Sequence, residues 1–343
     1  MKKILFGIIA AAILFSCSSH RNAVVPQPEV RTVIVEKKIG NAVSNEDLMI
    51  LGMLRQGCRN FSTSPMYSTD TWEGRLQLRL TELCNDPMFR NSQLGMVLYD
   101  ITDGRYLFTV NGEQRMRPAS CQKLVTAIAA IELLGCGYSY VPRIEKAGEG
   151  WCWDDDITSQ MPYSARRRMG ITDVLALMMK DSDNKMAESL FWQLSASGGG
   201  KPGSLLSVVS SIESVLCRAG IPKGSGYRIA DGSGLSLYNY ITPQMLNALL
   251  VYAWSREETR SLLFPSLPIG GVDGTLKKRF IGTCACNNIF AKTGTVTGVS
   301  SLSGYANGGN GHVISFCIIN QGIESGAMGR AFQDRVCVAL TER

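Results

Sequence analysis

A serine and a lysine stand three residues apart at the start of an apolar stretch, RPASCQKLVTAIAAIELLG, over residues 117–135. The stretch predicts a helix, and residues three apart on a helix share one face, so Lys123 can place its amine beside the Ser120 hydroxyl. Desolvation lowers the pKa of a lysine, which can then act as a base near neutral pH. The pair therefore indicates a serine nucleophile and its base, with free N–H groups of the helix N-terminus nearby to hold negative charge.

A serine that caps a helix and a lysine that extends its amine to water would fit the same spacing. The rest of the chain narrows the choice, because its two histidines are His20, near the N-terminus, and His312, in a later segment. A Ser-His-Asp triad or a zinc site with several histidines would have to be built on His312 alone. A serine enzyme with this sequence must therefore use a base other than histidine.

Two further motifs come later in the chain, Ser182-Asp183-Asn184 in KDSDNKMAESL and Lys292-Thr293-Gly294 in FAKTGTV. S-x-x-K combined with S-D-N and K-T-G is the signature of penicillin-binding proteins and class A β-lactamases. Each motif alone has an ordinary explanation, as a helix cap or a strand end. All three occur here in that order, which favours a serine enzyme that reacts with penicillins.

Three more stretches extend the pattern: DGSGLS at 231–236, GVDGTL at 271–276 and GAMGRAFQD at 326–334. With them the chain resembles a low-molecular-mass penicillin-binding protein of the D-alanyl-D-alanine carboxypeptidase/endopeptidase branch, from about Asp47 to the end. The resemblance implies a β-lactamase/transpeptidase-like fold and acyl transfer to water on peptidoglycan stem peptides. It also implies β-lactams as covalent inhibitors, with no metal and no organic cofactor.

The resemblance implies a role for each residue of the three motifs. Ser120 would attack the carbonyl of the penultimate D-alanine, and Lys123 would accept its proton. Ser182, helped by Lys292, would relay a proton to the leaving amine. Asn184 would bind the substrate backbone and steady Lys123.

The strand motif would bind the end of the substrate. Lys292, Thr293 and Thr295 would receive the terminal carboxylate, and the backbone N–H groups of Ser120 and Thr295 would form an oxyanion hole, often worth about 3 kcal/mol for each donor. Gly294 would matter because it lacks a side chain, so the acyl group can lie close against the strand.

The chain departs from this branch in two places. Members commonly carry a large insertion between the first two motifs, whereas Ser120 and Ser182 lie 62 positions apart here. Many relatives also follow DGSGLS with an arginine suited to a charged stem peptide, where this chain has Leu237. We therefore expect no added domain, and the match to a diaminopimelate side chain stays open.

Two rival functions share parts of the pattern. A class A β-lactamase adds a glutamate in an E-x-x-L-N loop, and the nearest match here is ESVLC, with Glu213 in a segment that predicts an amphipathic helix. A non-catalytic penicillin-binding or sensing module is the other alternative. Sensors of that kind are joined to transmembrane helices and a cytoplasmic effector, and we find neither in this sequence.

The secondary structure around these residues has a simple order. Leu76, Leu80 and Leu83 share one face of a helix predicted over 71–84. Alternating apolar residues at 94–99 and 105–110 then predict a hairpin. Mostly helical signals continue to about residue 258. Three strands at 288–296, 300–308 and 311–320 and a closing helix at 327–340 complete the chain.

This order predicts an α+β fold, in which an antiparallel sheet is flanked by helices with a mainly helical lobe at about 118–258. The first and last strands can then share one sheet. The chain of 343 residues is 45% hydrophobic, enough to bury a sizeable core. Its 35 basic and 29 acidic residues include no basic block, which gives no support for nucleic-acid binding.

The N-terminus, MKKILFGIIAAAILFSCSS, has the build of a secretory signal, with two lysines, an apolar run and small residues around Cys17. LFSC resembles a bacterial lipobox, whose cysteine becomes the lipidated first residue; an ordinary signal peptide with a chance cysteine is the alternative. The run is shorter than the ~20 residues that a membrane span needs. We predict a signal peptide over 1–16, a tether over 17–45 and a serine DD-peptidase domain over 46–343.

This organisation predicts a protein anchored by lipid on the periplasmic side of a bacterial membrane, the outer membrane rather than the inner. Ten cysteines besides Cys17 are an even number in a compartment that permits disulfides, but their pairing cannot be read from the sequence. Cys284 and Cys286 have no histidine nearby and indicate structural cysteines rather than a metal site.

Overall fold

The computed structural model describes residues 69–142, 145–147, 150–152, 168–196 and 204–343. The predicted signal peptide, the lipidation site at Cys17 and the tether lie outside the described residues. No helix in the described ranges is long and apolar enough to cross a membrane.

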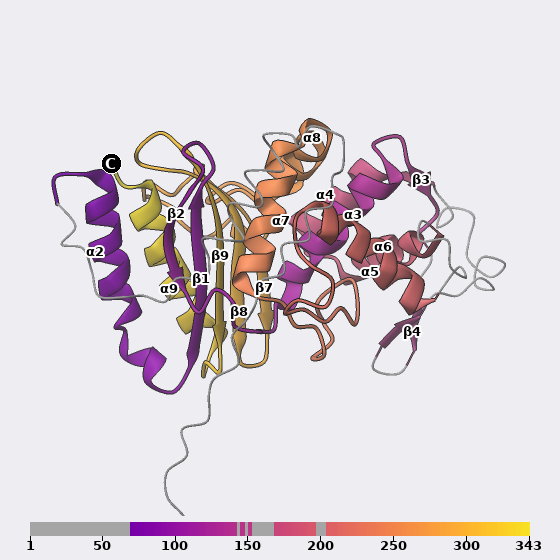
Figure 1. The fold of residues 1–343 in the computed structure, drawn as a ribbon, viewed down its shortest axis with the longest axis horizontal. Coiled ribbons are helices and arrows are strands. Elements are labelled where there is room, and N and C mark those ends of the chain that lie inside the picture. The colour runs from indigo at the N-terminus through magenta and orange to yellow at the C-terminus, as the bar shows by residue number, and fades with distance from the viewer. Residues whose placement is uncertain (1–68, 143–144, 148–149, 153–167, 197–203) are drawn as a thin grey trace, which may run out of the picture. The chain divides into compact units, whose positions relative to one another are not determined.

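Five antiparallel strands form the central sheet, in the order β2-β1-β9-β8-β7 (Figure 1). The hairpin of β1 (Gln93–Asp100) and β2 (Arg105–Val110) joins β9 (Val313–Gln321), so strands from both ends of the described chain share one sheet. β8 (Val299–Asn307) separates β9 from β7 (Ile289–Val296). The strand that carries the K-T-G motif is therefore an edge strand of this sheet.

Two helices cover one face of the sheet, α2 (Trp72–Cys84) and α9 (Gly326–Thr341) (Figure 1). The predicted leucine stripe of α2 is buried in the core between these helices and the strands. Thr71 caps α2 by accepting a hydrogen bond from the Gly74 N–H at 3.1 Å, which fixes the start of the helix.

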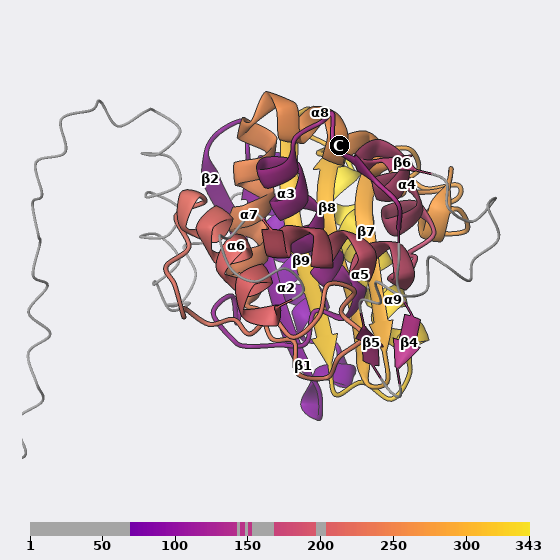
Figure 2. The same ribbon diagram turned by 90° about the vertical axis from the view of Figure 1, so that its right-hand side faces the viewer.

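The other face of the sheet carries the helical lobe. α7 (Pro243–Ser255) packs directly on β1 and β9, and the remaining helices lie beyond it (Figures 1 and 2). These are α3 (Gln122–Leu134), α4 (Ile171–Lys180), α5 (Asn184–Gln193), α6 (Leu205–Arg218) and α8 (Glu257–Ser266).

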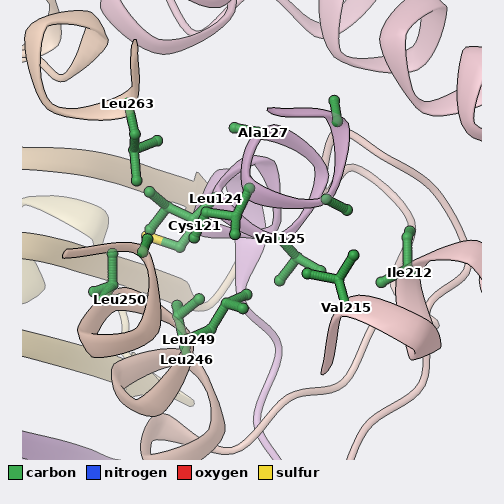
Figure 3. Close-up of a cluster of buried hydrophobic side chains, with 14 of the residues drawn as sticks. Cys121, Leu124, Val125, Ala127, Ile212, Val215, Leu246, Leu249, Leu250 and Leu263 are labelled. Atoms are coloured by element: carbon green, nitrogen blue, oxygen red, sulfur yellow. The ribbon is translucent and has the colours of Figure 1, made fainter. Parts of the chain in front are cut away.

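Helix α3 lies at the centre of the lobe, and every residue from Gln122 to Ile131 is buried. Its apolar side chains pack among those of α6, α7 and α8 in one cluster (Figure 3). Each fully buried leucine or valine in such a cluster contributes roughly 1.5–3 kcal/mol to stability. The helix that follows Ser120 is therefore a rigid support. The cluster includes Cys121, Leu124, Val125, Ile212, Val215, Leu246, Leu249, Leu250 and Leu263.

Short elements complete the described chain. Two small antiparallel pairs form in the lobe, one from β3 and β6 and one from β4 and β5. Their bounds are Ser139–Tyr140 for β3, Met169–Gly170 for β6, Glu145–Ala147 for β4 and Gly150–Cys152 for β5. The 3-10 turns are η1 (Pro87–Arg90), η2 (Ala119–Cys121), η5 (Leu194–Ala196) and η6 (Gly274–Leu276).

The predicted fold class is confirmed, as are the hairpin, the three later strands and the closing helix. One detail differs, because Ser120 lies in the 3-10 turn η2 and the α-helix begins after it, at Gln122. Helices also continue beyond residue 258, to Ser266. Eight cysteines whose side chains the structure describes are free thiols: Cys84, Cys121, Cys136, Cys217, Cys284, Cys286, Cys317 and Cys337.

Candidate active site

The three motifs meet where the helical lobe adjoins strand β7. Ser120 lies in η2 and Lys123 in the first turn of α3. Ser182 and Asn184 stand at the N-terminus of α5, while Lys292 comes from the middle of β7. Hydrogen bonds join Ser120, Lys123 and Asn184 in one group and Ser182 and Lys292 in another. The two lysines lie close enough that Lys123 lowers the pKa of Lys292.

The backbone around the two serines is held in unusual conformations. Ala119 and Ser182 have φ angles of 48° and 58°, in the left-handed region that costs a non-glycine residue about 1–3 kcal/mol. Gly234 packs against Ala119 so closely that a Cβ atom on it would lie 1.8 Å from the Ala119 carbonyl oxygen. Asp183 caps α5 by accepting a hydrogen bond from the Met186 N–H at 3.0 Å. The surrounding packing therefore fixes the turns that present Ser120 and Ser182.

The Lys123 amine has three polar neighbours. Its Nζ lies 3.0 Å from Ser120 Oγ, 2.7 Å from Asn184 Oδ1 and 2.8 Å from the Ser233 carbonyl oxygen. A neutral amine has two hydrogens and one lone pair, and the amide and carbonyl oxygens can only accept hydrogen bonds. With both hydrogens donated to these oxygens, the lone pair faces the Ser120 hydroxyl. This is the arrangement that a general base requires.

Burial tunes both lysines of the site. Desolvation lowers the pKa of Lys123 to about 8, against smaller opposing effects of the carboxylates of Glu188 and Asp231. Desolvation, and then repulsion by Lys123, lowers the pKa of Lys292 to about 7. About a tenth of the Lys123 amines are then uncharged at pH 7, which is enough for proton transfer from a serine.

The second pair of the site consists of Lys292 and Ser182. Lys292 donates hydrogen bonds to Ser182 Oγ at 2.9 Å and to the Thr293 carbonyl at 2.8 Å. Its side chain is fully buried, so this amine is fixed rather than free in water. Each serine hydroxyl of the site therefore has its own lysine.

The edge strand β7 lies directly against the nucleophile. A Cβ atom on Gly294 would lie 2.9 Å from the Ser120 backbone nitrogen and 2.2 Å from Ser301 Oγ, so only glycine fits there without displacing its neighbours. The Thr293 hydroxyl is 2.8 Å from that of Thr275. Thr295 is exposed on the same strand. An extended peptide can lie along such an edge and pair with its backbone.

The DGSGLS loop (231–236) also borders Lys123, which the three motifs alone did not predict. Besides the Ser233 carbonyl bound to Lys123, the Gly232 carbonyl accepts a hydrogen bond from the Thr126 hydroxyl at 2.8 Å. Glu188 of α5 accepts the N–H groups of Gly232 and Ser233. A backbone carbonyl leaves no mark in a sequence, but Glu188 lies one helical turn after Asn184, and that spacing was a usable signal.

A cavity of about 580 Å³ opens beside this loop. Its lining includes Arg117, Trp192, Leu235, Leu237 and Tyr238. Leu237 and Tyr238 are both more than half exposed. Leu237, directly after DGSGLS, therefore presents an apolar side chain at a cavity next to the site.

Three other residues considered in the sequence make contacts that stabilise the fold. Glu213 is on helix α6, as its pattern predicts, and pairs with Lys223 at 2.9 Å. The His312 ring is 2.9 Å from the Asp100 carboxylate, at the end of the hairpin. Asp273 accepts hydrogen bonds from Lys180 and from the Ile269 N–H, which supports a loop, as expected.

Known proteins share both the sequence pattern and the fold. The family model described as "D-Ala-D-Ala carboxypeptidase 3 (S13) family" matches residues 76–154 and 157–343. The D-alanyl-D-alanine carboxypeptidase DacB of Haemophilus influenzae is 34% identical over 158 residues, covering 46% of this chain and 33% of the relative. The D-alanyl-D-alanine carboxypeptidase of Actinomadura sp. is 36% identical over 177 residues, covering 50% of this chain and 32% of the relative. The matched region spans about a third of the length of each of these two relatives.

Solved structures are similar over most of the chain. Penicillin binding protein 4 of H. influenzae, complexed with a β-lactam, has a TM-score of 0.61 at 18% identity and covers 78% of this chain and 100% of that one. A class A β-lactamase representative of Bacteroides cellulosilyticus has a TM-score of 0.57 at 14% identity, covering 79% and 97%. At these identities the likeness concerns the fold.

Proposed function

Because the chain belongs to the D-Ala-D-Ala carboxypeptidase 3 (S13) family, we propose that it is a serine-type D-alanyl-D-alanine carboxypeptidase/endopeptidase that acts on peptidoglycan stem peptides. The observation that carries this function is the Lys123 amine, 3.0 Å from Ser120 Oγ, with both of its remaining neighbours acting as acceptors. The family resemblance inferred from the sequence is confirmed by the family match.

Acylation begins when Ser120 Oγ bonds to the carbonyl carbon of the penultimate D-alanine and its proton moves to Lys123 Nζ. The C–N bond to the terminal residue then breaks, and its amine takes a proton through Ser182, whose hydroxyl is 2.9 Å from Lys292. The proton held by Lys123 replaces the one that Ser182 delivers to the leaving amine, so Lys123 is neutral again. Water next attacks the ester, Lys123 accepts a proton from the water, and it passes this proton to Ser120 Oγ as the ester bond breaks. Atoms and charges balance without any further reactant.

The edge strand supplies the binding of the substrate terminus. Thr293 and Thr295 donate to the terminal carboxylate beside the Lys292 amine, and the N–H groups of Ser120 and Thr295 hold the oxyanion. The closeness of Gly294 to the Ser120 nitrogen supports this placement, because the nitrogen and the strand then face the same substrate carbonyl. Carboxypeptidase and endopeptidase action differ only in the group beyond the cleaved bond, so one site serves both.

The class A β-lactamase alternative receives no support from Glu213, whose partner is Lys223 on the lobe surface. A non-catalytic binding module does not require a lysine prepared as a base. Covalent capture of β-lactams follows from the same chemistry as acylation, because the opened lactam remains bonded to Ser120.

For location, we propose a lipid anchor at Cys17 on the periplasmic side of a bacterial membrane, the outer rather than the inner. The proposal rests on the lysines, apolar run and LFSC sequence of the N-terminus. Labelling of the full chain with a fatty-acid probe, lost in Cys17→Ala, would support it, whereas equal labelling of both chains would overturn it.

The enzymatic function is tested by incubation with a fluorescent penicillin and with muropeptides of known cross-linking, followed by mass spectrometry. We expect a penicilloyl adduct on Ser120 and release of D-alanine, both lost in Ser120→Ala. Turnover of the penicillin at the rate of its binding would favour a β-lactamase. An unmodified wild-type chain that releases no D-alanine would contradict the proposal.

A further inference from the structure

Helix α5 buries a carboxylate beneath the active site. Glu188 is 2% exposed and lies one turn after Asn184 on the same helix. Its two carboxylate oxygens accept separate backbone hydrogen bonds, from the Gly232 N–H at 3.2 Å and the Ser233 N–H at 2.8 Å. Burial of an ionisable group is costly, so two donors directed at one carboxylate mark a specific arrangement rather than a filled space.

The loop that Glu188 holds is also hydrogen-bonded to helix α3, which carries Lys123. The Ser233 carbonyl accepts a hydrogen from Lys123 Nζ at 2.8 Å, and the Gly232 carbonyl accepts one from the Thr126 hydroxyl at 2.8 Å. Peptide groups 232 and 233 therefore bridge α5 and α3. Any shift of their N–H groups moves the carbonyl that orients the lysine.

We propose that Glu188 is a positioning residue for the Ser120–Lys123 pair, which fixes the Ser233 carbonyl so that it takes one hydrogen of the neutral amine and leaves the lone pair towards the serine. The proposal deepens the function above and rests on it, because it assumes that Lys123 is the base. Asn184 takes the other hydrogen, so the amine is oriented by one side chain and one backbone group.

Glu188 also acts on Lys123 through its charge, because a nearby carboxylate stabilises the protonated amine. The titratable groups that face Lys123 come from each element around it: Cys121 from η2, Asp183 and Glu188 from α5, Asp231 from the loop and Lys292 from β7. Burial and then the neighbouring Asp231 raise the pKa of Glu188 to about 7. Near and above neutral pH its charge therefore contributes to holding the proton on Lys123.

Removal of the Glu188 charge should change the pH dependence of acylation in a definite direction. Acylation needs the uncharged amine, so its rate rises with pH through the pKa of Lys123. Removal of the Glu188 charge favours the uncharged amine and moves this rise to lower pH. A glutamine, however, can accept only one of the two N–H groups and places its own amide hydrogens against the other. The maximal rate therefore falls while the pH dependence shifts.

The experiment measures the second-order rate of acylation by a fluorescent penicillin from pH 5 to 10, for the full chain and for Glu188→Gln and Glu188→Asp. For Glu188→Gln we expect about a tenfold lower plateau and a rise that begins roughly one pH unit lower, at the low end of the shifts that a neighbouring charge produces. Glu188→Asp keeps the charge but is too short to reach both donors. We expect the plateau of its acylation rate to fall and the pH midpoint of that rate to stay at the wild-type value.

Glu132→Gln is the matched control, a buried glutamate at the other end of α3, where it accepts a hydrogen bond from Tyr252 at 2.8 Å. We expect its plateau and midpoint to match the wild type. Thermal unfolding of each variant shows whether it is folded; if Glu188→Gln is not, Glu188→Asp decides by its plateau.

Wild-type plateaus and midpoints in both Glu188 variants would overturn the proposal. Equal loss in the two variants with an unmoved midpoint in Glu188→Gln would reduce Glu188 to a structural role and would also overturn it. Failure of the proposed function looks different, because the wild-type chain would then not be acylated, or Ser120→Ala would be acylated as well.

Discussion

A buried glutamate lies near each end of helix α3: Glu132 of α3 itself at the C-terminal end, and Glu188 of α5 at the N-terminal end. The two carboxylates differ in how their charge is balanced. At the C-terminal end, Glu132 accepts hydrogen bonds from the hydroxyls of Tyr252 and Thr259, and both Arg218 and Arg256 approach it to 3.7 Å. At the N-terminal end, Glu188 is bonded to backbone N–H groups and lies near a second carboxylate, that of Asp231.

The difference separates a structural site from a reactive one. Two arginines offset the charge of the Glu132 carboxylate, and this cluster joins α3, α6, α7 and α8. At the other end no arginine among the described residues bonds to the carboxylate of Glu188. Burial moves the pKa of Glu188 up and that of Lys123 down until both fall near neutral pH. Groups with displaced pKa values in one cleft are typical of catalysis. Substitutions at the two ends should therefore affect different properties.

The largest effect on reactivity is expected from Lys123→Met. Loss of a general base slows a proton-transfer step by about 10²–10⁴-fold, while the thioether fills the buried space of the amine stem. The rate of acylation by a fluorescent penicillin checks this, with Lys277→Met, an exposed lysine, as a control that keeps the wild-type rate. Acylation of the Lys123 variant within threefold of wild type would place the base elsewhere.

Gly234→Ala is expected to act next most strongly, by about 100-fold on acylation. Its φ of 83° and the contact with the Ala119 carbonyl force either the loop or the turn before Ser120 to move, and a displacement of about 1 Å costs this much. Gly224→Ala is the matched control, since its φ is 74° but a Cβ atom there meets nothing within 4 Å. Equal rates for the two variants would show that the close contact is irrelevant.

The pH dependence of the wild-type chain is the third effect. Because the uncharged Lys123 amine is the reactive form and its pKa is about 8, acylation should rise about tenfold per pH unit below pH 7 and level off above about pH 9. Stopped-flow measurement with an uncharged chromophore on the β-lactam follows this directly. A rate that is flat from pH 5 to 8 would contradict the assignment.

The smallest effect on acylation, none within error, is expected at the opposite end of α3. Glu132→Gln removes charge-assisted hydrogen bonds and should lower the free energy of unfolding by about 1–3 kcal/mol. The two arginines left behind are about half exposed, so water solvates them and limits the loss. Urea denaturation measures the change. A stable Glu132→Gln chain with slow acylation would remove the distinction between the two ends.

Much of the site was predictable because its side chains lie in short motifs. Ser120 and Lys123 follow from helical spacing, and Ser182, Asn184 and Lys292 follow from the combination of S-x-x-K with S-D-N and K-T-G. The fold class followed from the order of elements, since hairpins and amphipathic helices depend on local patterns.

The remaining features depend on contacts between distant segments. The Ser233 carbonyl that binds Lys123 lies 110 positions away in the chain, and the side chain of residue 233 gives no sequence signal of this contact. The left-handed φ of Ala119 arises where Gly234 packs against its carbonyl, which is a property of the assembled lobe. The spacing of Glu188 from Asn184 places it on the face of the helix that carries the motif residue, but its role follows only from its burial and its two backbone donors.

Titration of the Lys123 amine itself, by NMR of the full chain labelled with ¹³C at lysine Cε, shows directly whether this amine is uncharged near neutral pH. The resonance is assigned by its absence in Lys123→Met. We predict a midpoint at about pH 8, coincident with the midpoint of acylation. A Lys123 resonance that stays in its protonated position up to pH 10, while Ser120 is acylated at pH 7, would contradict the account.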